Sequence, residues 1–344
     1  MDQLAVENHK QTLYFLLLFT LNQHYQLNHQ SLIYINQLFI KMKLFILNIL
    51  LISVAIYATA NTKSRLLNDI NERRQLIIGP DQRIQDTSKQ TYPAGTMGVL
   101  LPSGCTATLI SPSVILTAAH CLYDRAKKKM LAEEFYFYPN VISKDDIIES
   151  NKYKISKWDY NPKYETTPIV HPQNFGPETT YDIAMAKLDI IINPQNPLDD
   201  EWDWMHFGYD TTLTGPQIME TAGYPGDKEY GTRWYQTCKY NLVNNDVFQS
   251  IQNQGGDCDA FGGQSGSAVY KTVATKSSST DKVIYAVVSG GGYASEPDYG
   301  LWEVSATINK EDFNNICSFI KAAGDEEYVK GCEYNAQATK QNTY

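Results

Sequence analysis

The chain has 344 residues, which is enough for one or two domains with a sizeable core. Hydrophobic residues make up 43% and charged residues 19%, a balance that is typical of a globular protein and excludes an intrinsically disordered one. The formal net charge of −9 argues against a general nucleic-acid-binding protein.

An apolar segment near the amino terminus predicts a secretory signal peptide at residues 42–60. It begins with Met42 and Lys43, continues through a short apolar run, and ends in an Ala-x-Ala pattern at Ala60. The alternative is a transmembrane anchor, but the run is shorter than the ~20 residues that a membrane span needs. Because a signal peptide normally begins a chain, we expect residues 1–41 to be a spurious or disordered extension.

Residues 61–76 are polar and charged, and they contain the dibasic pair Arg73 and Arg74. This composition predicts a short propeptide with a processing site; a plain disordered linker is the alternative. We expect the mature protein to begin between Gln75 and Ile78.

From Ile77 onward, short apolar runs are separated by Gly, Pro, Asn and Asp, which indicates an all-β domain. The predicted strands lie at residues 95–101, 107–110, 114–117, 183–188, 218–224, 268–270 and 283–289. The polar stretches between them are predicted surface loops, at residues 141–180, 193–204 and 272–281.

One helix is predicted near the end of the chain. Asn309 can cap its start with Asp312 three residues further on, and Gly324 can end it. Four residues fall on one apolar stripe of this helix: Phe313, Ile316, Cys317 and Ile320. Strands followed by a single helix predict two β-barrels with a docking C-terminal helix over residues 77–324, and residues 325–344 form a polar tail.

A glycine-rich segment, GGQSGS at residues 262–267, contains a candidate nucleophile, Ser265. Glycine permits positive φ angles and close backbone approach, so such a turn can aim two backbone N–H groups at one point in front of the serine oxygen. A hairpin turn with an incidental serine is the alternative.

A serine nucleophile needs a base, which is most often histidine. Downstream of residue 76 the histidines are His120, His171 and His206. His171 precedes a proline in a polar stretch, and His206 lies among aromatic residues and suits a structural role. His120 follows a predicted strand in the segment TAAHC, where small residues leave room for a serine and a substrate.

Asp182 directly precedes the predicted strand 183–188. As the third member of a triad, it can orient the imidazole of His120. Capping of that strand is the alternative role. The order His120, Asp182, Ser265 along the chain is that of chymotrypsin, and it differs from the orders in subtilisin and in the α/β-hydrolases.

These motifs resemble those of trypsin-like serine proteases with the chymotrypsin fold, nearest to the glutamyl endopeptidases. The stretches that carry the resemblance are residues 77–83, 86–87, 92–93, 103–112, 117–121, 181–184, 223–228 and 262–267. The resemblance implies two six-stranded antiparallel β-barrels with a C-terminal α-helix. It also implies that His120 is the general base, Asp182 its orienter and Ser265 the nucleophile, with an oxyanion hole made by the N–H groups of Gly263 and Ser265.

Gln264 departs from this pattern, because chymotrypsin-like enzymes have an aspartate there and the glutamyl branch usually has an asparagine. In the resembling enzymes a new amino terminus pairs with that aspartate on activation. The stretch from Ile77 to Gly79 resembles such a terminus, but Gln264 offers no charge to receive it.

The resemblance also suggests specificity residues. Ser289 stands where bacterial relatives have a histidine that helps to recognise glutamate. Asp259 lies six residues before Ser265, where trypsin has its selector for basic residues; a loop aspartate facing water is the alternative. Gly290 and Gly291 can pair with the substrate backbone as an added strand. We therefore rank basic residues first at the cleavage site, apolar residues second and acidic residues last.

The six cysteines include no CxxC pair, which indicates disulfides in an oxidising compartment rather than a zinc site. The count alone does not choose a connectivity. The resemblance implies the pairs Cys105–Cys121, Cys238–Cys258 and Cys317–Cys332. No metal or organic cofactor is expected.

The sequence therefore predicts a secreted serine endopeptidase that hydrolyses protein or peptide substrates through an acyl-enzyme. We expect a monomer with no nucleic-acid partner and no stable membrane association. The alternatives are a catalytically inactive binding module with a protease fold and a serine esterase or peptide ligase using the same site.

Overall fold

A computed structural model describes part of the chain. The described residues are 40–41, 75–76, 80–89, 92–168, 179–192, 204–210, 216–243, 247–249, 258–274, 280–293, 301–325 and 332. The chain divides into two units, Met1–Ile70 and Asn71–Tyr344, and all elements below belong to the second. Among the described residues, no helix is long and apolar enough to cross a membrane.

Several sequence-based predictions fall outside the described residues. These are the signal peptide at 42–60, the propeptide except for its last two residues, the stretch from Ile77 to Gly79, and His171. The same holds for the C-terminal tail except Asp325 and Cys332.

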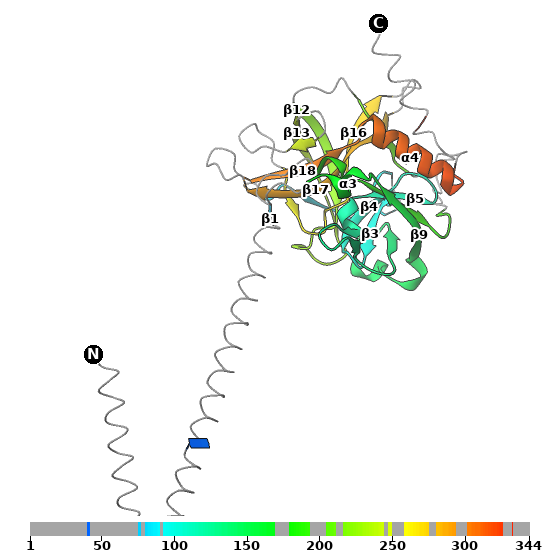
Figure 1. The fold of residues 1–344 in the computed structure, drawn as a ribbon. Helices are drawn as coiled ribbons and strands as arrows, with labels where there is room; N and C mark the ends of the chain where they lie inside the picture. Colours follow the sequence, from blue (N-terminus) through cyan, green and yellow to red (C-terminus); the bar gives the residue numbers. More distant parts are fainter. Residues whose placement is uncertain are drawn as a thin grey trace, which may run out of the picture. The chain divides into compact units, whose positions relative to one another are not determined.

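The first half of the domain forms a closed six-stranded barrel in the order β10-β5-β4-β3-β8-β9, with antiparallel neighbours throughout (Figure 1). Its strands are β3 (Met97–Leu101), β4 (Cys105–Leu109), β5 (Val114–Thr117), β8 (Tyr136–Pro139), β9 (Tyr153–Tyr160) and β10 (Ala184–Leu188). Every residue of β4 and β5 is buried, which explains why apolar and small residues fill both strands.

The second half closes in the same way. Its pairings lead from β12 through β13, β14, β18, β17 and β16 back to β12. These strands are β12 (Pro216–Gly223), β13 (Arg233–Val243), β14 (Val247–Gln249), β16 (Ala268–Ala274), β17 (Thr280–Tyr293) and β18 (Leu301–Thr307). Two short strands extend this sheet: β2 (Ile84–Asp86) pairs with β13, and β11 (His206–Phe207) runs parallel to β17. The predicted fold of two six-stranded barrels is confirmed.

The remaining elements are short. Two strand pairs are β1 (Gln75–Leu76) with β15 (Ala260–Phe261), and β6 (Tyr123–Asp124) with β7 (Lys129–Met130). The short helices are α3 (Lys163–Thr166), η1 (Ala94–Thr96), η2 (Ala119–Cys121), η3 (Lys144–Asp146), η4 (Glu149–Asn151) and η5 (Thr179–Tyr181).

Most predicted strand boundaries differ from the observed ones by a few residues, and three predicted segments differ in kind or extent. The stretch 141–180, predicted as a loop, contains the eight-residue strand β9. Ile155 is the only fully buried residue of β9, so the strand lacks the apolar run that marks the others. The predicted loop 272–281 is narrower than expected, because β16 continues to Ala274 and β17 begins at Thr280. The strand predicted over 95–101 begins only at Met97, after the 3₁₀ helix η1.

The helix α4 (Lys310–Ala323) confirms the predicted signals at both ends. The Asn309 side chain accepts hydrogen bonds from the N–H groups of Glu311 and Asp312, and Asp312 completes the capping box. Gly324 ends the helix in the left-handed conformation at φ 90°. The apolar face buries Phe313, Ile316, Phe319 and Ile320.

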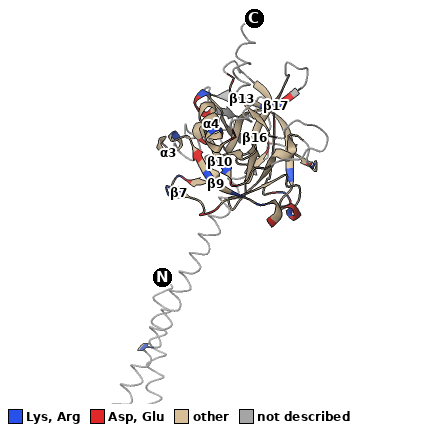
Figure 2. Cartoon of the chain, turned by 90° about the vertical axis from the view of Figure 1, so that its right-hand side faces the viewer, with Lys and Arg blue, Asp and Glu red and all other residues tan. Residues whose placement is uncertain are grey.

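Polar contacts at both ends fasten α4 to the rest of the domain. Beyond its end, Oδ2 of the buried Asp325 accepts hydrogen bonds from Ser111 Oγ at 2.6 Å and from Ser113 N and Oγ at 2.9 Å each. At its start, Glu311 pairs with Lys163 of α3 at 2.5 Å. Figure 2 shows acidic and basic residues together around α4.

The structure contains the three disulfides that the family resemblance implies. The Cα–Cα distances are 6.0 Å for Cys105–Cys121, 5.2 Å for Cys238–Cys258 and 5.9 Å for Cys317–Cys332, within the range that a disulfide spans. They join β4 to η2, β13 to the segment before β15, and α4 to the tail.

A pH-dependent stability effect is expected from Asp312. Burial raises the pKa of this carboxyl to about 6, even though Asn161 Nδ2 donates to its Oδ1 at 3.0 Å. Between about pH 4 and 6 the folded protein therefore binds this proton more tightly than the unfolded chain, so the stability that the group contributes is lost as pH rises. Relative to wild type, Asp312→Asn should gain up to about 3 kcal/mol of unfolding free energy between pH 4 and pH 7.

Urea unfolding of both proteins at the two pH values measures this difference. The exposed Asp189→Asn is the control and should show no comparable gain. Stability curves of Asp312→Asn and wild type that run parallel from pH 4 to pH 7 would contradict the prediction.

Candidate active site

His120 and Asp182 are brought together by neighbouring strands. Ala184 at the start of β10 pairs with Thr117 at the end of β5, so the residues just beyond this pair meet at one edge of the first barrel. His120 Nδ1 lies 2.7 Å from Asp182 Oδ2, and the His120 N–H donates to Asp182 Oδ1 at 2.9 Å. Asp182 Oδ2 therefore orients the imidazole and Oδ1 holds the His120 backbone, with Nε2 on the ring edge opposite Asp182.

The Asp182 side chain is buried, and it accepts a further hydrogen bond from Ser289 Oγ. Burial opposes its ionisation, but the charge of His120 and the hydrogen bonds from His120 and Ser289 outweigh burial and hold the pKa of Asp182 below its usual value. The carboxylate is thus kept ionised beside the ring.

Ser289 was predicted to line the substrate pocket, and the structure instead directs its hydroxyl to Asp182. The pairing of β17 with β18 is irregular between Val288 and Gly290, which re-aims the side chain between them. Gly290 and Gly291 pair with Val304 and Glu303 of β18, and their predicted pairing with a substrate stays a prediction.

The turn that carries Ser265 is held by its own backbone. Gln264 N donates to Phe261 O at 3.0 Å, and Gly266 N donates to Val288 O at 2.8 Å. Gly263 has φ +106°, and a Cβ on it would lie 2.3 Å from Tyr224 O, so only glycine fits at this position.

Two backbone N–H groups of this turn have no hydrogen-bond acceptor among the described residues. Within the described part of the chain, the N–H groups of Gly263 and Ser265 donate to no acceptor, whereas those of Gln264, Gly266 and Ser267 are used. The two groups predicted to form an oxyanion hole are therefore available to a ligand.

The same turn is docked on the first barrel through Thr106 of β4. Thr106 N donates to Ser265 O at 2.9 Å, and Thr106 Oγ1 donates to Gly263 O at 2.8 Å. A Cβ on Gly266 would lie 2.2 Å from Thr117 Oγ1, so the turn also packs against the end of β5. The structure thereby brings Ser265 to the barrel edge that carries His120 and Asp182.

Asp259 is fully buried, so the alternative in which it faces water is wrong. Its Oδ2 accepts a hydrogen bond from Gln82 N at 2.8 Å, and its backbone N–H donates to Gln236 Oε1 at 2.9 Å. Sequence reasoning missed this contact, because the segment 80–83 is distant in the chain and looks like a polar loop.

Two other groups of titratable side chains were considered. His206 Nδ1 hydrogen-bonds to Asp281, which agrees with a structural role for this histidine. Cys105, His120 and Cys121 lie close enough together to hold a metal ion, but the two sulfur atoms are joined in a disulfide and offer no thiolate ligand.

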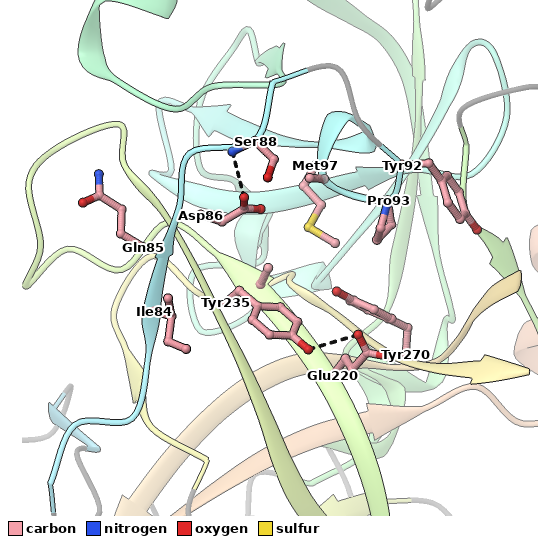
Figure 3. A pocket seen from close by; sticks show the side chains of 12 residues that line it. Ile84, Gln85, Asp86, Ser88, Tyr92, Pro93, Met97, Glu220, Tyr235 and Tyr270 are labelled. Carbon is pink, nitrogen blue, oxygen red and sulfur yellow. Dashed lines mark hydrogen bonds between the residues drawn. The ribbon is translucent and has the colours of Figure 1, made fainter. Parts of the chain in front are cut away.

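A cavity of about 300 Å³ lies elsewhere, between β2, β12 and β13 (Figure 3). Its two carboxylates already have protein partners, since Asp86 pairs with Arg233 at 3.0 Å and Glu220 pairs with Lys282 at 2.7 Å. None of His120, Asp182 or Ser265 lines it.

Two closed β-barrels with these side chains at their junction define the class of the two-barrel serine endopeptidases. A family model described as Trypsin matches residues 84–310, which is more than half of the chain. The chain belongs to the trypsin family.

Two curated proteins and one solved structure are similar to this chain. The chain is 22% identical to the glutamyl endopeptidase of Bacillus licheniformis over 249 residues, covering 72% of this chain and 70% of that protein. It is 24% identical to the extracellular metalloprotease of Bacillus subtilis over 251 residues, covering 70% and 68%. The structure of a Glu endopeptidase in complex with MPD matches with a TM-score of 0.53 and 22% identity, covering 72% of this chain and 99% of that one, which supports the fold.

Loss of the Ser289 hydroxyl should destabilise the protein in a pH-dependent manner. Because this group stabilises ionised Asp182, Ser289→Ala should lower the unfolding free energy at pH 7 by about 1.5–3 kcal/mol. The difference in unfolding free energy between Ser289→Ala and wild type should shrink as pH falls through the lowered pKa of Asp182, since the carboxylate is then protonated in both proteins.

Urea unfolding at pH 7 and at pH 3 measures the deficit. Ser305→Ala is a matched control, since Ser305 is also buried and its Oγ has no hydrogen-bond partner in the described structure. An equal loss for both variants at pH 7 would contradict the assignment of this hydrogen bond.

Proposed function

We propose that this chain is a secreted serine endopeptidase in which Ser265 is the nucleophile, His120 the general base and Asp182 its orienter. One observation carries the proposal. The His120–Asp182 pair lies at the barrel edge to which the Ser265 turn is hydrogen-bonded through Thr106. A serine, an oriented imidazole and two unused N–H groups are the parts that acyl transfer requires.

In the proposed reaction, Ser265 Oγ attacks the carbonyl carbon of the scissile bond and its proton passes to His120 Nε2. The oxyanion that forms accepts hydrogen bonds from the Gly263 and Ser265 N–H groups. Asp182 stays ionised and stabilises the imidazolium, which its lowered pKa favours. His120 then gives the proton to the leaving amine, and a water molecule repeats the sequence to release the acyl group.

For the chain organisation we propose a signal peptide at 42–60, a propeptide at 61–76, a protease domain at 77–324 and a polar tail at 325–344. Three disulfides with no free cysteine among the described residues support an oxidising compartment. One relative is named as an extracellular enzyme, which also supports secretion.

For specificity we propose a preference for Lys or Arg on the amino side of the cleaved bond. Asp259 keeps a carboxylate buried six residues before the nucleophile. The Ser289 hydroxyl is engaged by Asp182, which disfavours its use for a substrate carboxylate. One relative is named a glutamyl endopeptidase, so cleavage after Glu is the contrasting outcome.

Replacing the proposed nucleophile tests whether the protein is an active enzyme or a catalytically inactive binding module. Ser265→Ala should fold normally and lose about 10⁶-fold in kcat, by analogy with subtilisin. Asp182→Asn should lose about 10⁴-fold, by analogy with trypsin. Peptide hydrolysis and labelling by a fluorophosphonate measure both. Wild-type protein that resists labelling would support the inactive-module alternative, and hydrolysis of esters but not peptides would support the esterase.

A substitution that removes only the charge of Asp259 tests the proposed preference for Lys or Arg at the cleavage site. Asp259→Asn keeps the side-chain size and an acceptor for Gln82 N–H but removes the charge. For Lys and Arg peptides kcat/KM should fall at least about 30-fold, equivalent to about 2 kcal/mol, with little change for Leu peptides. The exposed Asp159→Asn is the control. A wild-type enzyme that cuts chiefly after Glu, or an Asp259→Asn loss shared by all peptides, would refute this role.

A further inference from the structure

Arg83 is a fully buried cation whose five N–H groups are all hydrogen-bonded. Nε and Nη2 donate to Asp81 at 3.0 Å each, and Nη1 and Nη2 donate to Asp227 at 3.0 Å and 2.5 Å. The fifth N–H, on Nη1, donates to Gln264 Oε1 at 3.2 Å. The guanidinium therefore reaches the residue that directly precedes the candidate nucleophile.

Gln264 uses this contact to close the turn. Its side chain is buried, and the same Oε1 also accepts the N–H of Phe261 at 2.9 Å. The Arg83 contact thus fixes which atom of the amide points into the turn. The next residue on each side of Gln264 carries one of the two unused N–H groups.

The charges of this cluster are already balanced. Lys228 Nζ pairs with Asp81 at 2.5 Å, so two cations, Arg83 and Lys228, face two carboxylates, Asp81 and Asp227. A residue that contacts Arg83 from the nucleophile turn must therefore be neutral, because a further buried carboxylate would be uncompensated. This explains the neutral glutamine at a position where chymotrypsin-like enzymes have an aspartate.

The segment that carries Arg83 contacts the nucleophile loop at a second point, where Gln82 N donates to Asp259 Oδ2. Residues 82 and 83 thus hold both ends of the loop 259–264. All of these contacts form in the uncut chain, in which β1 lies ahead of the segment and pairs with β15.

Building on the proposed function, we propose that Arg83 is a positioning residue: an internal cation that holds the turn 261–265 in its reactive shape before any cleavage of the chain. A freed amino terminus is then not needed to build the oxyanion hole. Removal of the preceding segment leaves the geometry of the turn intact.

Charge substitutions in the cluster test the positioning role. Gln264→Glu adds an uncompensated carboxylate and should lower kcat for a peptide ester about 100-fold with little change in KM, as a displacement of ~1 Å would. Asp227→Asn alone should cost about tenfold, and combined with Gln264→Glu it restores the charge balance. The double variant should recover at least about tenfold over Gln264→Glu, whereas independent structural losses would add.

Asp86→Asn is the matched control. It breaks the other buried arginine pair, Arg233 with Asp86, which does not contact the nucleophile turn. It should lower the thermal unfolding midpoint and leave kcat and fluorophosphonate labelling unchanged. Additive losses in the double variant, or full activity of Gln264→Glu, would overturn the proposal.

An uncut chain tests the same inference without altering the cluster. Arg73→Gln with Arg74→Gln, shown by mass spectrometry to keep residues 61–76, should react with a fluorophosphonate within about threefold of the processed protein. A folded, uncut chain that fails to react would overturn the inference alone. Processed wild type that never reacts would overturn the proposed function, and this inference with it.

Discussion

The nucleophile turn of the second barrel is hydrogen-bonded to the first barrel through one threonine. Thr106 is fully buried in β4 of the first barrel, and its N–H and hydroxyl donate to Ser265 O and Gly263 O of the second. Its Oγ1 also accepts the N–H of Tyr224 at 3.1 Å. Because these bonds join strands that are far apart in the sequence, the position of the nucleophile turn relative to His120 follows from them and not from local structure.

The polar groups around this junction show why buried charge is tolerated there. Asp182 is surrounded by donors from His120 and Ser289, and Arg83 has an acceptor for every N–H. A buried ion is costly unless its hydrogen-bonding capacity is met, and both are met by groups that the fold holds in place. The stability of the fold and the geometry of the candidate site are therefore linked. Removing a hydrogen-bond partner of Asp182 or Arg83 would move the residues that face a substrate.

Strands made of apolar or small residues and a helix with capping residues at both ends could be predicted from the sequence. Contacts between distant segments could not. β5 matches its predicted range because all four of its residues are buried and apolar or small, and α4 matches because Asn309 and Gly324 mark its ends. β9 was missed because half of its residues are exposed and only Ile155 is buried. The fold and the three disulfides followed from resemblance, whereas the Arg83–Gln264 contact spans 181 positions and leaves no local pattern. Ser289 was predicted to contact the substrate, but its hydroxyl bonds to Asp182. The irregular pairing of β17 with β18 sets the direction of this side chain, and the sequence carries no sign of that irregularity.

The carboxylate of Asp325 has a consequence for the order in which the chain can fold. It accepts hydrogen bonds from Ser111 and Ser113, more than 200 positions earlier, and it is buried in doing so. The turn between β4 and β5 therefore stays incompletely bonded until α4 and Asp325 have been synthesised. Long-range closure of this kind slows folding, so the first barrel, although made first, reaches its final form only after the second barrel and α4 have been made.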